Sequence, residues 1–93
     1  MYHLYILECA DGTLYTGIAV DVVRRVREHN TSALGAKYTR GRRPVRVVFS
    51  RMFRDRAAAA RGEFRVKRMS RREKLEMIER EKRRSVRDSH RRA

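Results

Sequence analysis

The chain is poor in the residues that crosslink small proteins or anchor them in membranes. It has one cysteine, Cys9, one proline and no tryptophan. A single thiol excludes a disulfide within these 93 residues and fits a reducing compartment. No apolar run approaches the ~18 residues of a transmembrane helix, and the N-terminal stretch does not resemble a signal peptide. We therefore expect a cytoplasmic protein without a membrane partner.

Acidic side chains are also scarce. The chain has 11 Asp and Glu against 25 Lys and Arg, which gives a net charge of +14 at pH 7. Such a surface attracts polyanions, and nucleic acid is the first candidate. The basic residues are mostly arginine, which favours forked contacts to phosphate. Acidic lipid is a weaker alternative because no segment combines a wide apolar face with a basic one. A basic surface that serves solubility alone is the third alternative.

The pattern of apolar residues predicts a ββαβαα order. Strands are expected over residues 2–8, 13–18 and 45–53. Asp21 is expected to cap a helix that reaches about His29, and Asp55 a helix that reaches about Met69. Residues 31–44 are expected to form a loop with one helical turn. Ser70 and Glu73 match a capping box that begins a third, short helix, with Leu75 and Ile78 facing inward.

The apolar rhythm stops after Ile78. Residues 79–93 contain seven Lys or Arg, three acids and one valine. Such a segment buries too little apolar surface to order itself. We therefore expect one domain over residues 1–78, followed by a basic tail over 79–93 that is a frayed helix or disordered.

The turn at Ala10-Asp11-Gly12 allows two registers for the first two strands. A two-residue turn would place Tyr5 opposite Ile18 and put Tyr5 and Tyr15 on opposite faces of the sheet. A three-residue loop would place Tyr5 opposite Gly17, so that the two phenols become diagonal neighbours on one face. Gly12 can supply the left-handed residue that such loops favour.

The first predicted helix separates two adjacent arginines. At about 100° per residue, Val22, Val23 and Val26 form one stripe. Arg25 and His29 lie along its border, whereas Arg24 lies on the far side with Glu28. Arg25 is therefore the arginine directed toward the sheet edge. The alternative is an ordinary amphipathic helix with charged flanks.

The second predicted helix carries a carboxylate near its apolar side. Arg61, Arg65 and Arg68 cluster on one face, and Glu63 projects from roughly the opposite side, with Ala59, Ala60, Phe64 and Val66 nearby. An inward carboxylate is costly unless it meets a cation or a metal. An ion pair between Glu63 and Lys67 within the helix is the alternative explanation.

These spaced residues resemble the GIY-YIG nuclease superfamily, in particular its small stand-alone bacterial members. Tyr15-Thr16-Gly17 stands at the second motif, and His3-Leu4-Tyr5 stands where Gly-Ile-Tyr would be. Arg25 follows the second motif tyrosine by ten residues, His29 lies four further on, and Glu63 falls on the metal-ligand glutamate. The stretch from Ala36 to Pro44 is also similar. The resemblance covers about residues 2–78.

The resemblance implies an α+β fold in which a three-stranded antiparallel sheet is flanked by helices. It also implies phosphodiester hydrolysis with one divalent metal, Mg²⁺ or Mn²⁺, held by Glu63. Tyr15 would be the base for the attacking water, with Arg25 and His29 beside it, and Tyr5 and Tyr38 would orient water or phosphate. A shared site for both phenols favours the three-residue loop.

The basic residues around this site then indicate a surface for DNA. Lys37, Tyr38, Arg40, Arg42 and Arg43 would flank the site, and the tail from Arg80 to Arg92 would extend it. Contacts to phosphate carry no base code, so we expect a DNA endonuclease that selects structure rather than sequence. We expect it to be monomeric and nucleoid-associated, with a role in repair or recombination. One alternative is a nucleic-acid-binding module that retains the fold without cleavage. Another is an RNA- or ribosome-associated protein.

Overall fold

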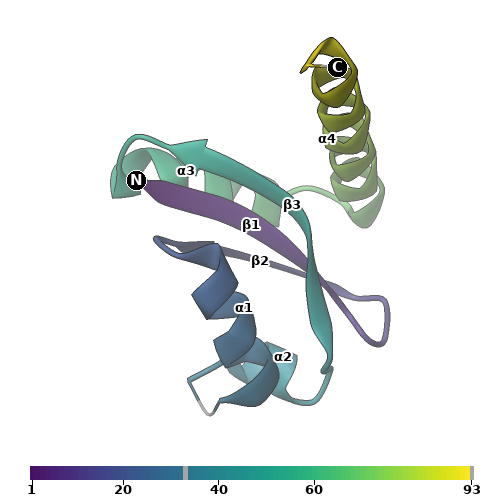
Figure 1. Ribbon diagram of the computed structural model, residues 1–93. Coiled ribbons are helices and arrows are strands. Elements are labelled where there is room, and N and C mark those ends of the chain that lie inside the picture. Colours follow the sequence, from purple (N-terminus) through teal and green to yellow (C-terminus); the bar gives the residue numbers. More distant parts are fainter. Residues whose placement is uncertain (33, 93) are drawn as a thin grey trace.

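The protein forms a three-stranded antiparallel sheet with helices on both faces, as the sequence predicts (Figure 1). The computed structural model describes residues 1–32 and 34–92, with side chains as far as Arg84. Its elements are β1 (Tyr2–Cys9), β2 (Leu14–Ala19), α1 (Val22–Thr31), α2 (Lys37–Arg40), β3 (Val45–Phe53), α3 (Arg56–Lys67) and α4 (Arg71–Arg92). The strand order is β2-β1-β3.

The first hairpin has the register of the three-residue loop. Tyr5 pairs with Gly17 and Leu7 with Tyr15, and Gly12 closes the loop with a φ of 83°, a conformation that glycine adopts without steric cost. The prediction that Tyr5 and Tyr15 share one face is therefore confirmed.

Each face of the sheet has its own apolar cluster. On one face Tyr5, Leu7, Cys9 and Val45 are buried and contact Val22 and Val26 of α1. On the other face α3 and α4 cover a cluster made of Leu4, Ile6, Phe49, Val66, Met77 and Ile78. Alternate residues of β1 point to opposite faces, so the central strand contributes to both clusters. Figure 1 shows α1 and α2 on one side of the sheet and α3 on the other.

A bulge lets β3 contribute to both clusters as well. The pairing of β1 with β3 shifts between Ile6 and Leu7, so that Ile6 pairs with Phe49 but Leu7 pairs with Val47. The additional residue reverses which face the following side chains occupy. As a result Val45 packs under α1, whereas Phe49 packs under α3 and α4.

The predicted helix starts are confirmed by their hydrogen bonds. The Asp21 and Asp55 carboxylates accept from the backbone amides of Arg24 and Ala58 at 3.0 and 2.8 Å. Ser70 and Glu73 form both bonds of the capping box, at 3.0 and 3.1 Å. Each cap satisfies amides that a helix N-terminus leaves without a partner.

Three details of the helices differ from the predictions. Val23 is 71% exposed and does not join the apolar stripe of α1, because that helix covers the sheet over a narrower arc. Leu75 is 41% exposed, and Met77 is buried with Ile78 in its place. The third helix is long rather than short, since α4 spans 22 residues.

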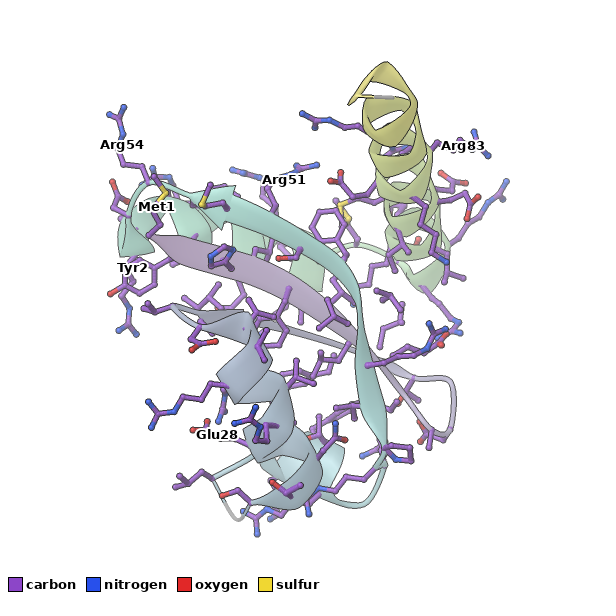
Figure 2. The ribbon with its side chains drawn as sticks, viewed as in Figure 1. Met1, Tyr2, Glu28, Arg51, Arg54 and Arg83 are labelled. Carbon is purple, nitrogen blue, oxygen red and sulfur yellow. The ribbon has the colours of Figure 1, made fainter. Side chains whose placement is uncertain are left out.

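Arg51 of β3 lies 3.7 Å from Glu81 of α4, whereas Arg83 points outward (Figure 2).

Within residues 1–32 and 34–92, no helix is both long and apolar enough to cross a bilayer.

Asn30, whose role the sequence does not reveal, ties the end of α1 to the start of β3. Its side chain accepts from the Val45 amide at 2.7 Å and donates to the Val45 carbonyl at 3.0 Å.

We expect Asn30→Ala to lower the free energy of unfolding by about 2–3 kcal/mol, because both backbone groups lose their partner. Chemical denaturation would measure this. Thr31→Ala, next in sequence but exposed, should change stability by less than about 1 kcal/mol, and equal effects would contradict the role of Asn30.

Candidate active site

Four aromatic rings lie together between the first hairpin and α1. Tyr5 of β1, Tyr15 of β2, His29 of α1 and Tyr38 of α2 form a continuous cluster, with ring centroids 5.2–6.5 Å apart between neighbours. The rings of Tyr5 and Tyr15 are 6.5 Å apart, and that of His29 lies 5.2 Å from Tyr15. The structure thus brings together three of the five residues that the sequence predicts to be catalytic.

Tyr5 reaches the cluster by crossing its neighbouring strand. A Cβ placed on Gly17 would lie 2.5 Å from the Tyr5 hydroxyl and 2.7 Å from Cζ. The ring therefore lies directly over the Gly17 backbone, a space that a side chain would fill. Gly17 therefore allows the Tyr5 ring to approach the backbone of β2 closely. Its φ is negative, so a strained backbone is not the reason for glycine here.

A buried hydrogen-bonded chain runs from Tyr5 through His29 to Thr39. The Tyr5 hydroxyl lies 3.0 Å from His29 Nε2, and His29 Nδ1 lies 2.8 Å from Thr39 Oγ1. Because Thr39 donates its own proton to the Ala36 carbonyl at 2.9 Å, we assign the imidazole proton to Nδ1, from which Thr39 accepts. The Ala36 amide is 3.4 Å from Nδ1, the longer and weaker contact. Nε2 is then left to accept from Tyr5.

Burial fixes the protonation states along this chain. Burial and, after it, the electrostatic effect of Tyr15 outweigh the opposing effect of Arg25 and raise the pKa of the Tyr5 hydroxyl to about 12. Burial and, after it, the positive charge of Arg25 lower the pKa of His29 to about 4. At neutral pH Tyr5 is therefore a protonated donor and His29 a neutral acceptor. Tyr5 cannot act as a base in this state.

Arg25 points into the site, as predicted, and Arg24 points away. The side chain of Arg25 is 28% exposed and that of Arg24 75%. Arg25 Nη1 donates to Glu28 Oε1 at 2.9 Å and to the Leu34 carbonyl at 2.7 Å. The helical spacing predicted that Glu28 lies with Arg24 on the far side of the helix, but Glu28 also forms an ion pair with Arg25. It contacts both arginines, and its side chain is 22% exposed.

Glu63 approaches the cluster from the opposite face of the sheet. Its negative charge contributes to the raised pKa of Tyr5, after burial and Tyr15, so the carboxylate acts on the same hydroxyl as Arg25. The predicted alternative is also present, because Glu63 Oε2 lies 3.6 Å from Lys67 Nζ. Within the described residues, no group of three or more His, Cys, Asp or Glu converges. Of the predicted catalytic residues, Glu63 is the one with a carboxylate, the ligand that hard divalent cations prefer.

The rim of the site is a stack of a cation and two rings. Tyr38 stacks on Tyr15, and the Arg42 guanidinium lies 4.1 Å from the centre of the Tyr38 ring. Arg42 also donates to Asp11 at 3.1 Å and to the Tyr38 carbonyl at 2.8 Å. Lys37 and Arg40 of α2 are exposed beside this stack.

Arg43, unlike the other basic residues predicted to contact phosphate, forms hydrogen bonds with the end of α1. It donates to the carbonyls of His29 and Ser32 at the C-terminal end of α1. These orphan carbonyls need donors, so the observed contacts of Arg43 stabilise the helix end. The predicted residues of the basic tail lie on α4, where the described side chains end at Arg84.

Comparison with known proteins agrees with this geometry. A protein-family model described as the GIY-YIG catalytic domain matches residues 1–76. The chain therefore belongs to the GIY-YIG family of nuclease domains, and the resemblance stated from the motifs is confirmed.

Its relatives are small UPF0213 proteins. The one from Desulfotalea psychrophila is 52% identical over 69 residues, which are 74% of this chain and 63% of that protein. The one from Halobacterium salinarum is 51% identical over 80% of this chain and 95% of that protein. The solution NMR structure of the UPF0213 protein BH0048 from Bacillus halodurans has 48% identity and a TM-score of 0.55, covering 85% of this chain and 84% of that one.

The protonation state of His29 makes a prediction about acid stability. A histidine in an unfolded chain takes up a proton near pH 6.5, whereas folded His29 does so only near pH 4. The unfolded state therefore binds more protons in this window, and the free energy of unfolding falls as the pH drops through it, by up to about 3 kcal/mol. Urea denaturation from pH 8 to 4 would measure this. His29→Gln should flatten the dependence in this window, and His3→Gln should retain it.

Gly17 provides a second test. Gly17→Ala should destabilise the fold by about 1–3 kcal/mol, because the added methyl group displaces the Tyr5 ring. Gly41→Ala is the control, since a Cβ there meets no atom within 4 Å. Thermal unfolding of the two variants compares them. Equal stability would show that Tyr5 does not depend on this close approach.

Proposed function

We propose that this protein is a divalent-metal-dependent endonuclease that hydrolyses phosphodiester bonds in branched, nicked or flapped DNA. The observation that carries the proposal is the contact of two phenols with an imidazole on one face of the sheet, beside two opposite charges that act on one of the phenols. Tyr5, Tyr15 and His29 are in contact, and the charges of Arg25 and Glu63 both act on the Tyr5 hydroxyl. Membership of the nuclease family agrees with this use.

The two tyrosines have different roles in this proposal. Tyr5 is held as a proton donor to His29, so it orients the site. Tyr15, on the same face, is assigned as the base that takes a proton from the attacking water. Arg25, positive at every physiological pH, stabilises negative charge that develops on the phosphate. Arg25 would exchange its hydrogen bond with the Leu34 carbonyl for one with phosphate.

The donor chemistry of the site fits a hard divalent cation. Glu63 offers one partly exposed carboxylate, 25% exposed at its side chain, and Mg²⁺ is commonly held by one or two carboxylates while it retains several waters. Mn²⁺ accepts the same oxygen ligand. When bound, such an ion neutralises charge on a phosphate oxygen and on the leaving group. Lys67, 3.6 Å from the carboxylate, would move aside on its flexible side chain.

The substrate contacts proposed beside the site are to phosphate. Lys37, Arg40 and Arg42 flank the rings, and Tyr38 lies between them and Tyr15. Arg43 is left out of the surface, since it is engaged with the end of α1. Contacts of this kind do not read bases, which is why we propose selection by DNA structure and a role in repair or recombination. A monomer on the nucleoid is the proposed form, with α4 as a basic extension.

The test is cleavage of labelled branched and linear DNA with Mg²⁺ or Mn²⁺. Glu63→Gln and Tyr15→Phe should each lower the cleavage rate by about 100-fold or more, and chelation of the metal should abolish it. Glu76→Gln is the control, because it removes an exposed carboxylate of α4.

Two outcomes would contradict parts of this proposal. Cleavage that survives both Glu63→Gln and Tyr15→Phe would show that the site is elsewhere. DNA that is retarded in gels but is not cut with any metal would favour the alternative, a binding module that retains the nuclease fold. Exchange of DNA for structured RNA tests the third function, since preferential RNA binding would overturn DNA as substrate.

A further inference from the structure

The outer face of α3 carries a second basic surface, separate from the one around α2. Four residues form this arginine–phenylalanine face: Arg61, Phe64, Arg65 and Arg68. At 100° per residue they fall within an arc of about 100° on the helix, and all four are exposed. The only acid of α3 is Glu63, which contacts Lys67. Among the described residues, none of the three arginines forms an ion pair.

Phe64 is an exposed aromatic ring within this charge. It is 62% exposed, and the Arg68 guanidinium lies 5.3 Å from the centre of its ring. A single exposed apolar residue is ordinary on a protein surface. A phenylalanine surrounded by three arginines without acidic partners is the combination that binds unpaired nucleotides, because bases stack on the ring while the arginines contact phosphates.

The face belongs to the helix that carries Glu63. Phe64 directly follows Glu63 in the chain, and α3 contacts both β1 and β2. The other basic surface, with Lys37 and Arg40, belongs to α2 on the opposite side of the sheet (Figure 1). The rings thus lie on the face of the sheet that carries one basic surface, and Glu63 lies on the helix that carries the other.

We propose that the arginine–phenylalanine face binds an unpaired DNA strand of the substrate, with a base stacked on Phe64. This inference rests on the proposed function in one respect, that the substrate is nucleic acid. Bases within a duplex are already stacked on their neighbours and cannot reach an external ring, whereas unpaired bases can. The duplex binds at α2 and the unpaired strand passes over α3. The substrate class is therefore DNA in which a single strand meets a duplex.

The chain offers a direct readout because it contains no tryptophan. Phe64→Trp introduces a single indole on which a base can stack, and stacking quenches its fluorescence. The probes are oligo-dT and an abasic oligodeoxyribose phosphate of equal length and charge, titrated in EDTA so that no cleavage occurs. Met52→Trp on β3, also exposed, is the matched control.

We expect oligo-dT to quench Phe64→Trp strongly, and the abasic strand to quench it at least tenfold less at equal saturation. The Met52→Trp signal should not change with either strand. Fluorescence anisotropy of labelled strands follows binding independently. Phe64→Ala should weaken binding of oligo-dT about 5- to 100-fold and leave binding of the abasic strand unchanged.

The arginines are tested by the salt dependence of binding. Arg61→Gln with Arg65→Gln should reduce the slope of log K against log salt for single strands by about 1.4, at about 0.7 per contact. The control pair is Arg46→Gln with Arg51→Gln, which removes equal charge from β3 and should leave the slope unchanged. Equal reductions in both double variants would overturn a defined surface on α3.

The remaining outcomes separate this inference from the proposed function. Binding by anisotropy without quenching of Phe64→Trp would overturn the inference, and equal quenching by the abasic strand would overturn base stacking. Absence of any oligo-dT binding would also overturn it, while cleavage of branched duplexes would still support the endonuclease. Selective quenching without cleavage would support the inference and contradict the endonuclease.

Discussion

The structure depends on one close contact, the passage of the Tyr5 ring over the backbone of Gly17. This contact requires the three-residue loop, because only that register places Tyr5 opposite the glycine. It also carries the phenol to His29, whose other nitrogen is held by Thr39. A strand, a hairpin and two helices are thus coupled through a single buried hydroxyl, and the burial that couples them keeps this hydroxyl protonated and the imidazole neutral.

Much of the fold follows from local sequence signals. The caps at Asp21, Asp55 and Ser70 and the bounds of β3 were predictable, because capping and strand patterns depend on neighbours in the chain. The exposure of Val23 and Leu75 was not predictable. Periodicity gives the apolar side of a helix but not the width of the surface that the helix covers. The β3 bulge was missed for a similar reason, since Val45, Val47 and Phe49 alternate regularly in sequence.

The candidate site, like the fold, contains residues that local sequence signals predicted and residues that they did not. Motif spacing predicted Tyr5, Tyr15, Arg25, His29 and Glu63 as site residues. The structure brings the rings of Tyr5, Tyr15 and His29 together, and the charges of Arg25 and Glu63 act on the Tyr5 hydroxyl. Thr39 gave no signal, because a buried threonine in a polar, basic loop resembles any surface residue. The role of Arg43 at the C-terminal end of α1 was not predictable either, because it depends on where the loop before β3 lies in the fold. Tertiary contacts of this kind have no local sequence pattern.

The stack at the rim connects the site to a distant turn. Asp11, in the first hairpin loop, holds Arg42 against Tyr38, and the Ala10 amide bonds to the Arg42 carbonyl. The ion pair is about half exposed, so mobile ions screen it. Ionic strength therefore acts on this protein in two places. It weakens the attraction for a polyanion, and it weakens the ion pair that holds Arg42 against Tyr38, so the shape of the candidate site itself responds to the electrolyte around it.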